Sequence, residues 1–183
     1  MRLTRILAVC AIFAAALGQA DVRGCVCDLA SPETASKKEC SLCREVERRP
    51  QDPQFFVIPD ADPKKPNRRL ALPRFHGVNP QELSQMTLEQ RTAYWTVAIH
   101  EAEQLWGDGW GLAVNALANR GQCHMHIHIG KRNAGVEDER FQFVKTPAEF
   151  PLPRPDDGIW VHPVAGGYHV HWGDKSPELL LQR

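Results

Sequence analysis

The chain has 183 residues, in which 22 Lys and Arg balance 22 Asp and Glu. A formal charge of zero excludes a general electrostatic attraction to nucleic acid, although a small phosphate site can still be locally basic. About 160 residues follow the first twenty, which is enough for one domain with its own hydrophobic core.

The first twenty residues are typical of a secretory signal peptide. Arg2 and Arg5 supply a positive start, residues 6–17 an apolar run, and residues 18–20 a small-residue cleavage site. The apolar run is short for a membrane span, and charges or prolines interrupt every later hydrophobic stretch. We therefore expect an exported protein, periplasmic or secreted, with an uncleaved N-terminal anchor as the alternative.

Residues 21–50 are charged and turn-rich, and within them residues 21–39 form a predicted cysteine-containing lead-in. Export favours disulfides, and an odd number of cysteines leaves at least one thiol free or bound to another group. Cys40 and Cys43 also have the spacing of a metal-binding knuckle. The sequence leaves disulfides and metal binding open. The cysteines after the signal peptide are Cys25, Cys27, Cys40, Cys43 and Cys123.

Hydrophobic periodicity then predicts short strands around one long helix. A short helix is expected at residues 80–85, and Thr87 is the predicted N-cap of a longer helix that ends near Trp106 and has one apolar face. Consecutive short strands with one packed helix indicate an α+β fold with an antiparallel sheet. Strands are expected at residues 55–58, 70–72, 112–115, 123–129, 141–144, 159–161, 168–172 and 179–181.

The most informative segment is the predicted strand at residues 123–129. His124, His126 and His128 alternate there with Met125 and Ile127, and a strand sends alternate residues to one face. Imidazole can act near neutral pH as a base, a nucleophile or a metal ligand. Three imidazoles on one strand indicate a functional site. The alternative is that the three histidines are solvated residues of a half-buried strand and have no function.

Together these motifs resemble the histidine-triad (HIT-like) superfamily over roughly residues 40–130. The resemblance includes the Cys-x-x-Cys pair, the loop at residues 60–66, the segment at residues 70–76, the long helix and residues 111–115 before the triad. It implies a HIT-like domain over residues 40–135, with residues 136–183 as a C-terminal β extension packed on that domain.

Within the superfamily, the spacing of Asn115, Arg120 and Gln122 before the triad is similar to that of the CDP-diacylglycerol pyrophosphatase branch. The resemblance implies that His126 is a nucleophile that forms a covalent phosphohistidine and that His128 assists proton transfer. A neutral imidazole suits this role because it is a good nucleophile near pH 7. Asn115, Arg120 and Gln122 are then expected to bind the substrate phosphates.

The same resemblance implies a structural zinc ion held by Cys40, Cys43, His76 and His124, an S2N2 set that suits tetrahedral zinc. In the alternative, His124 supports the nucleophile and the cysteines form disulfides. No organic cofactor is expected. Three later histidines could reach the pocket, bind a second metal ion or be solvated. These are His162, His169 and His171.

The sequence therefore predicts an exported phosphoanhydride hydrolase that cleaves a nucleotide or a nucleotide–lipid (CDP-lipid) diphosphate. The alternative is a metal-binding protein in which His124, His126 and His128 ligate one ion without HIT chemistry. A HIT fold kept only for binding or assembly is a third hypothesis, against which the intact triad argues. No nucleic-acid partner is expected, and peripheral membrane contact and homodimer formation are left open.

Overall fold

The computed structural model describes residues 21–50, 52–76, 81–154 and 156–183. The predicted signal peptide lies outside the described residues. Among the residues that are described, no helix combines the length and the apolar character needed to cross a bilayer.

The described part of the chain forms a seven-stranded antiparallel sheet and one long helix, α3 (Leu88–Trp106). The predicted α+β fold with an antiparallel sheet is therefore confirmed. The strand order across the sheet is β1-β2-β4-β3-β6-β7-β5. The strands are β1 (Phe55–Pro59), β2 (Arg69–Pro73), β3 (Trp110–Val114), β4 (Ile127–Lys131), β5 (Gln142–Val144), β6 (Ile159–Val164) and β7 (Gly167–Trp172).

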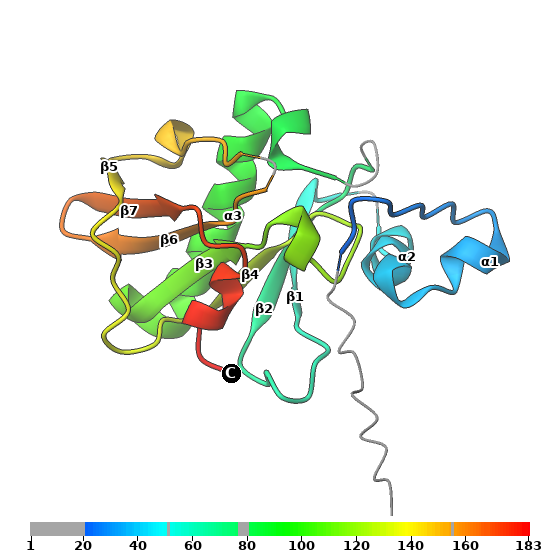
Figure 1. Cartoon of the computed structure of the whole chain (residues 1–183), viewed down its shortest axis with the longest axis horizontal. Helices are drawn as coiled ribbons and strands as arrows, with labels where there is room; N and C mark the ends of the chain where they lie inside the picture. The colour runs from blue at the N-terminus through cyan, green and yellow to red at the C-terminus, as the bar shows by residue number, and fades with distance from the viewer. Residues whose placement is uncertain (1–20, 51, 77–80, 155) are drawn as a thin grey trace, which may run out of the picture.

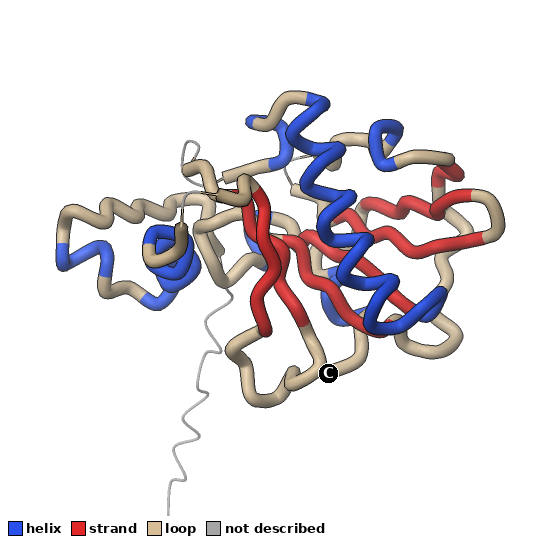
Figure 2. The backbone as a smooth tube through the Cα atoms, turned by 180° about the vertical axis from the view of Figure 1, so that it is seen from behind, coloured by secondary structure: helices blue, strands red, loops and turns tan. Residues whose placement is uncertain are grey.

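Helix α3 begins where the sequence predicted. The Thr87 hydroxyl accepts a hydrogen bond from the Gln90 amide, and the Gln90 side chain accepts one from the Thr87 amide, so two free N–H groups of the first turn are satisfied. Tyr94, Trp95 and Ala98 are buried against the sheet. The helix lies behind the sheet in Figure 1 and in front of it in Figure 2, so it covers one face only.

The other face of the sheet carries the histidines. Residues that pair across an antiparallel sheet point to the same face, and one row of pairs joins His128 to Ala113, Ala113 to Trp160, and Trp160 to His171. The neighbouring row points toward α3 and is apolar. The sheet therefore places part of the triad and the late histidines on one face, away from the helix. The apolar row contains Leu112, Ile129, Val161 and Val170.

The triad segment differs from the prediction, because β4 begins only at Ile127. The amide of Cys123 donates to the carbonyl of Glu39 at 2.8 Å, and the amide of Met125 donates to the Gln81 side chain at 2.9 Å. These donors are used outside the sheet, so the chain before Ile127 cannot pair as a strand. The three histidine rings consequently do not share one flat row.

The predicted strand at residues 179–181 is also wrong, since residues Pro177–Leu180 form a 3-10 helix. Pro177 starts this turn, and the Arg68 guanidinium donates to the carbonyls of Glu178 at 2.7 Å and Leu181 at 2.6 Å. Arg68 is 1% exposed. Of the predicted strand, only Leu181 pairs, in an isolated β-bridge with Arg132.

The lead-in contains more helix than the sequence indicated. Helix α1 (Pro32–Ala35) and a 3-10 turn precede α2 (Ser41–Glu47), where an irregular segment was expected. Leu42 and Val46 of α2 pack on β1 and β2, which gives this short helix its stability. In Figure 1, α2 lies beside β1.

Strands β5, β6 and β7 correspond to the predicted C-terminal β extension. They continue the same sheet, because Leu112 of β3 pairs with Val161 of β6. The remaining elements are the 3-10 turns Leu83–Gln85, Gly107–Gly109, Leu117–Asn119 and Pro147–Glu149. The first of these replaces the helix predicted at residues 80–85.

Candidate functional site

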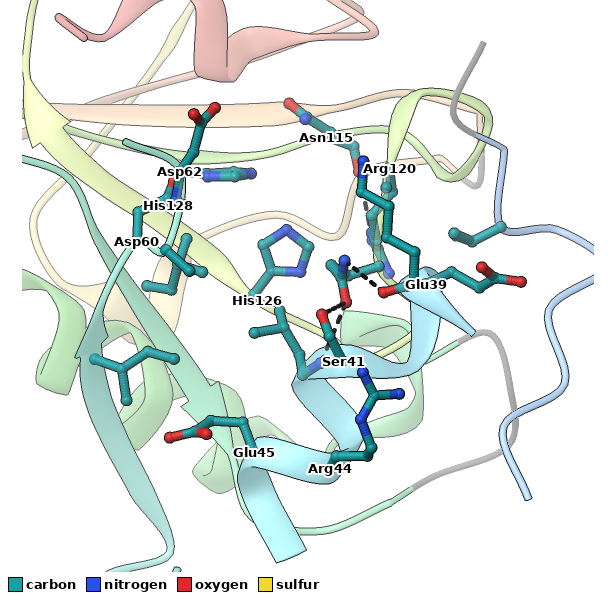
Figure 3. A pocket seen from close by; sticks show the side chains of 18 of the residues that line it. Glu39, Ser41, Arg44, Glu45, Asp60, Asp62, Asn115, Arg120, His126 and His128 are labelled. Carbon is teal, nitrogen blue, oxygen red and sulfur yellow. Dashed lines mark hydrogen bonds between the residues drawn. The ribbon is translucent and has the colours of Figure 1, made fainter. Parts of the chain in front are cut away.

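A pocket of about 1150 Å³ lies where β4 begins, and the rings of His126 and His128 line it. Helix α2 forms one side, and the loop between β1 and β2 forms another. In Figure 3 the His126 ring stands in the middle of this space, with Ser41 and Arg44 of α2 on one side and Asn115 on the other. The predicted catalytic pair therefore lies in a pocket.

His126 has a defined orientation. Its Nδ1 lies 2.9 Å from the main-chain carbonyl of His124, and a carbonyl can only accept, so Nδ1 carries the proton. Nε2 is then the nitrogen with a free lone pair. Burial lowers the pKa of His126 well below its ordinary value, and the charges of His128 and Arg120 lower it further. The ring is therefore neutral at pH 7.

His128 lies next to a carboxylate that the sequence analysis missed. Its Nδ1 is 3.6 Å from Glu178 Oε2. Burial lowers the pKa of His128 to about 4, against the opposing effect of Glu178. Both ring nitrogens of His128 are buried, and neither has a hydrogen-bond partner among the described residues. The ring therefore lacks a partner that a ligand in the pocket could supply.

Glu178 is fixed by residues from three segments. The Asn115 side chain donates to Oε1 at 3.0 Å, and Lys65 forms an ion pair with Oε2 at 2.8 Å. Burial raises the pKa of Glu178, but His128, Lys65 and Asn115 outweigh it and hold the value at about 2. Glu178 follows the triad by fifty residues and directly precedes the strand predicted at residues 179–181, so no local motif identified it.

The three predicted substrate-binding residues line the pocket, but most of their polar groups bind the protein. Asn115 holds Glu178 through both side-chain atoms. The Arg120 guanidinium donates to the carbonyls of Gln81 and Asn115, and its Nε has no partner. The Gln122 side chain accepts from Ser41 and Leu42 and donates to Lys38. Their clearest role is to assemble the pocket walls.

Other cations also line the pocket. Lys65 comes from the β1–β2 loop, Arg44 comes from α2, and Arg48 follows that helix. Lys65 pairs with Glu178, and Arg44 donates to two main-chain carbonyls, so these charges too are partly used by the protein. The sequence showed them only as parts of a loop and of the charged segment at residues 21–50. Acidic side chains, including Asp60 and Asp62, also line the pocket (Figure 3). The pocket is therefore polar and of mixed charge.

The sequence left both disulfides and metal binding open for the cysteines, and the structure contains two disulfides. Cys27 is bonded to Cys40, and Cys25 is bonded to Cys123. Cys43 is the free thiol among the described residues, which agrees with the odd count. Cys40 cannot act as a thiolate ligand while it is oxidised, so the predicted four-residue zinc set loses one member.

The other three members of that set do converge. Ligand atoms of Cys43, His76 and His124 lie within 4.8 Å of one another and could hold a metal ion. His124 Nε2 donates to the Pro73 carbonyl at 2.8 Å, which leaves its buried Nδ1 without a partner. Burial raises the pKa of Cys43 to about 11. A metal ion would have to displace the thiol proton on binding.

His126 and His128 do not belong to any of the potential metal-ligand groups formed by the described residues. His124 faces Cys43 and His76 instead. The geometry therefore does not favour the alternative in which all three triad histidines ligate one ion. A second group of potential metal ligands lies on β6 and β7 and is formed by Glu137, His162, His169 and His171.

The comparisons with known proteins leave the family open. No protein-family model matches this chain, and no curated protein matches it as a relative. Function must therefore be inferred from the residues of the pocket and their geometry.

Proposed function

We propose that this protein is an exported HIT-like hydrolase that cleaves phosphoric anhydrides through a covalent phosphohistidine on His126. The observation that carries the proposal is the hydrogen bond from His126 Nδ1 to the His124 carbonyl, 2.9 Å long. It directs the free lone pair to Nε2 of a neutral ring that lines the pocket. A neutral imidazole in this form is a competent nucleophile.

In the proposed reaction, His126 Nε2 attacks a phosphorus atom of the anhydride. A P–N bond forms, the bridging P–O bond breaks, and the leaving phosphate takes the electron pair of that bond. Water then attacks the phosphorus, a P–O bond forms, the P–N bond breaks, and its electron pair returns to Nε2. The attacking water gives up one proton, for which His128 is the proposed acceptor. Negative charge grows on phosphate oxygens in both steps, and the cations Lys65 and Arg44 line the same pocket.

His128 and Glu178 support this chemistry as a pair. A proton on His128 Nδ1 would face the carboxylate of Glu178. The buried, unpartnered Nε2 would then bind a phosphate oxygen of the substrate. A phosphate dianion near the ring would raise the pKa of His128 from about 4 and let the ring carry a proton. Asn115 then acts indirectly, because it holds the carboxylate that orients His128.

The pocket favours a substrate with a polar diphosphate and one flat or apolar group. Leu42, Ile58 and Leu70 supply an apolar strip beside the charged lining. This strip suits a nucleobase or the first part of a lipid, so nucleotide diphosphates and CDP-lipids are both candidate substrates. The predicted signal peptide and the resemblance to the CDP-diacylglycerol pyrophosphatase branch support an exported enzyme of this class.

We further propose that zinc can occupy the site of Cys43, His76 and His124 in a structural role. One sulfur and two nitrogen donors suit zinc, with a non-protein ligand in the fourth position. The unpartnered Nδ1 of His124 supports this assignment. Zinc there would tie α2 to the loop whose carbonyl orients His126.

Trapping of the intermediate tests the proposed function. The protein would be mixed with a radiolabelled dinucleoside polyphosphate or with CDP-diacylglycerol in micelles, and the reaction would be stopped in alkali. We expect a nucleoside monophosphate product and an acid-labile, alkali-stable label on His126. A single-turnover reaction with product but no labelled protein would contradict covalent catalysis, and turnover of one substrate alone would identify the class.

A further inference from the structure

A second histidine cluster lies on the hairpin of β6 and β7, outside the pocket. His162 of β6 pairs directly with His169 of β7, and His171 lies two residues further along β7. All three therefore point to the same face of the sheet. Glu137 reaches this face from the segment between β4 and β5. None of these four residues lines the pocket that contains His126.

The four side chains converge on one point. Glu137 Oε1 lies 3.1 Å from His169 Nδ1, 3.2 Å from His162 Nε2 and 3.6 Å from His171 Nε2. The two Nε2 atoms of His162 and His171 are 3.2 Å apart. Donor atoms of a tetrahedral zinc site, with bonds of roughly 2.0–2.2 Å, are separated by about 3.3 Å. These four separations therefore match four of the six edges of such a tetrahedron.

Hydrogen bonds alone do not account well for this geometry. A single carboxylate oxygen offers two lone-pair directions, which His162 Nε2 at 3.2 Å and His169 Nδ1 at 3.1 Å use. His171 Nε2, at 3.6 Å from the same oxygen, is left without a hydrogen bond to it. Two buried ring nitrogens, on His162 and His171, also face each other. A cation at the centre would satisfy all four donors at once.

The rings are held in place before any ion binds. The Trp160 ring stacks on His171 at 3.9 Å and 9°, and the Phe141 ring stacks on His169 at 3.7 Å and 15°. His162 and His171 are each 1% exposed, whereas the Glu137 side chain is 47% exposed. The site is thus rigid on the protein side and open to solvent at the carboxylate, where an ion can enter.

Burial lowers the pKa of His171 to about 4 and also lowers that of His162, so both rings are neutral. Arg132 Nη1 can only donate and lies 2.9 Å from His162 Nδ1, so in the ion-free structure Nδ1 accepts and Nε2 carries the proton that faces Glu137 Oε1 at 3.2 Å. An ion at Nε2 would require that proton to move to Nδ1, where the Pro163 carbonyl at 3.2 Å can accept it. Arg132 would then keep its ion pair with Glu137 Oε2 at 3.3 Å.

We propose that Glu137, His162, His169 and His171 form a binding site for one divalent transition-metal ion, with three nitrogen ligands and one oxygen ligand. This donor set suits Zn²⁺ and, among cations used as probes, Co²⁺. The ion would fix the segment that carries Glu137 to the edge hairpin of the sheet. The proposal does not depend on the proposed hydrolase activity.

Cobalt titration of the chelator-treated full-length protein provides the test. Tetrahedral Co²⁺ absorbs strongly in the visible range, and a thiolate ligand adds a sulfur-to-metal band in the near ultraviolet. We expect one equivalent of visible absorbance without a thiolate band in Cys43→Ser. Wild-type protein should show this same signal, together with any thiolate-banded cobalt held by the Cys43, His76 and His124 group. That variant removes the thiol of the Cys43, His76 and His124 group, so the two sites are distinguished.

Glu137→Gln should weaken Co²⁺ and Zn²⁺ binding by about tenfold or more, with an unchanged melting temperature of the metal-free protein because the side chain is exposed. Asp138→Asn is the matched control, since Asp138 is the adjacent acid and pairs with Arg140 instead. In the Cys43→Ser background, His169→Ala should abolish the visible band. The proposal is overturned if Glu137→Gln and His169→Ala bind like wild type, or if all cobalt absorbance carries the thiolate band.

Discussion

Two groups of histidines occupy the same face of one sheet, yet their surroundings differ. At the pocket, a main-chain carbonyl orients His126, and the carboxylate of Glu178 lies 3.6 Å from His128. At the hairpin, one oxygen of Glu137 is shared by three rings. Both groups begin from the same His-x-His alternation in the sequence.

The comparison shows that the position of the carboxylate distinguishes the two sites. At the pocket, Lys65 and Asn115 bind the carboxylate of Glu178. Glu178 therefore cannot lie among several rings as a metal ligand, and it lies beside one ring, that of His128. Glu137 is partly exposed and stands among the rings of its cluster. The first arrangement suits nucleophilic and acid–base chemistry, and the second suits an ion.

The largest expected effect is on the rate of hydrolysis, and it distinguishes the pocket histidines from the hairpin histidines. His126→Ala should reduce single-turnover hydrolysis by more than about 10⁴-fold, because the covalent route loses its nucleophile. His100→Ala is the matched control, as His100 is an exposed histidine of α3. Rescue of His126→Ala by added Zn²⁺ would show instead that the triad works as a metal site.

The two disulfides should stabilise the pocket end of the sheet more than the hairpin end. The Cys25–Cys123 bond closes a loop of 98 residues and the Cys27–Cys40 bond a loop of 13. Paired Ser substitutions should lower the free energy of unfolding by about 4–5 kcal/mol for the first bond and about 3 kcal/mol for the second. Denaturant titration measures both, and a reversed order would contradict the loop argument.

His128→Ala should slow turnover by roughly 10²–10⁴-fold, less than loss of the nucleophile, because a general acid–base group is removed. Pre-steady-state kinetics should show that formation of the intermediate still occurs. If His126→Ala and His128→Ala have equal and mild effects, the division of roles between the two rings is wrong.

The smallest effect concerns the pH dependence of stability. The pKa of Glu178 is about 2 in the folded protein and about 4.3 when unfolded, a difference worth about 3 kcal/mol. This stability is present above pH ~4.3 and is lost as the pH falls through about 2. Glu178→Gln should flatten that part of the unfolding profile, whereas Glu137→Gln should leave it nearly unchanged.

The α+β fold followed from local patterns. The Thr87 cap and the apolar face of α3 depend on residues that are three and four positions apart in the sequence. Most strands are short apolar segments bounded by residues that favour turns. The strand at residues 179–181 failed because Pro177 starts a 3-10 turn and because Arg68, more than a hundred residues away, binds the carbonyls of Glu178 and Leu181. The triad strand began late because Glu39 and Gln81 take its amide protons.

The sequence by itself determined the fold class, the His-x-His pairs and the odd thiol, because alternation, capping and residue counts are local properties. Only the tertiary structure decided which carboxylate each histidine meets. Glu178 and Glu137 reach the rings through chain reversals that no short motif encodes. It likewise decided that Cys40 pairs with Cys27, since that bond depends on how the lead-in folds back on the sheet. Long-range packing brings these groups together, and their spacing then sets the chemistry.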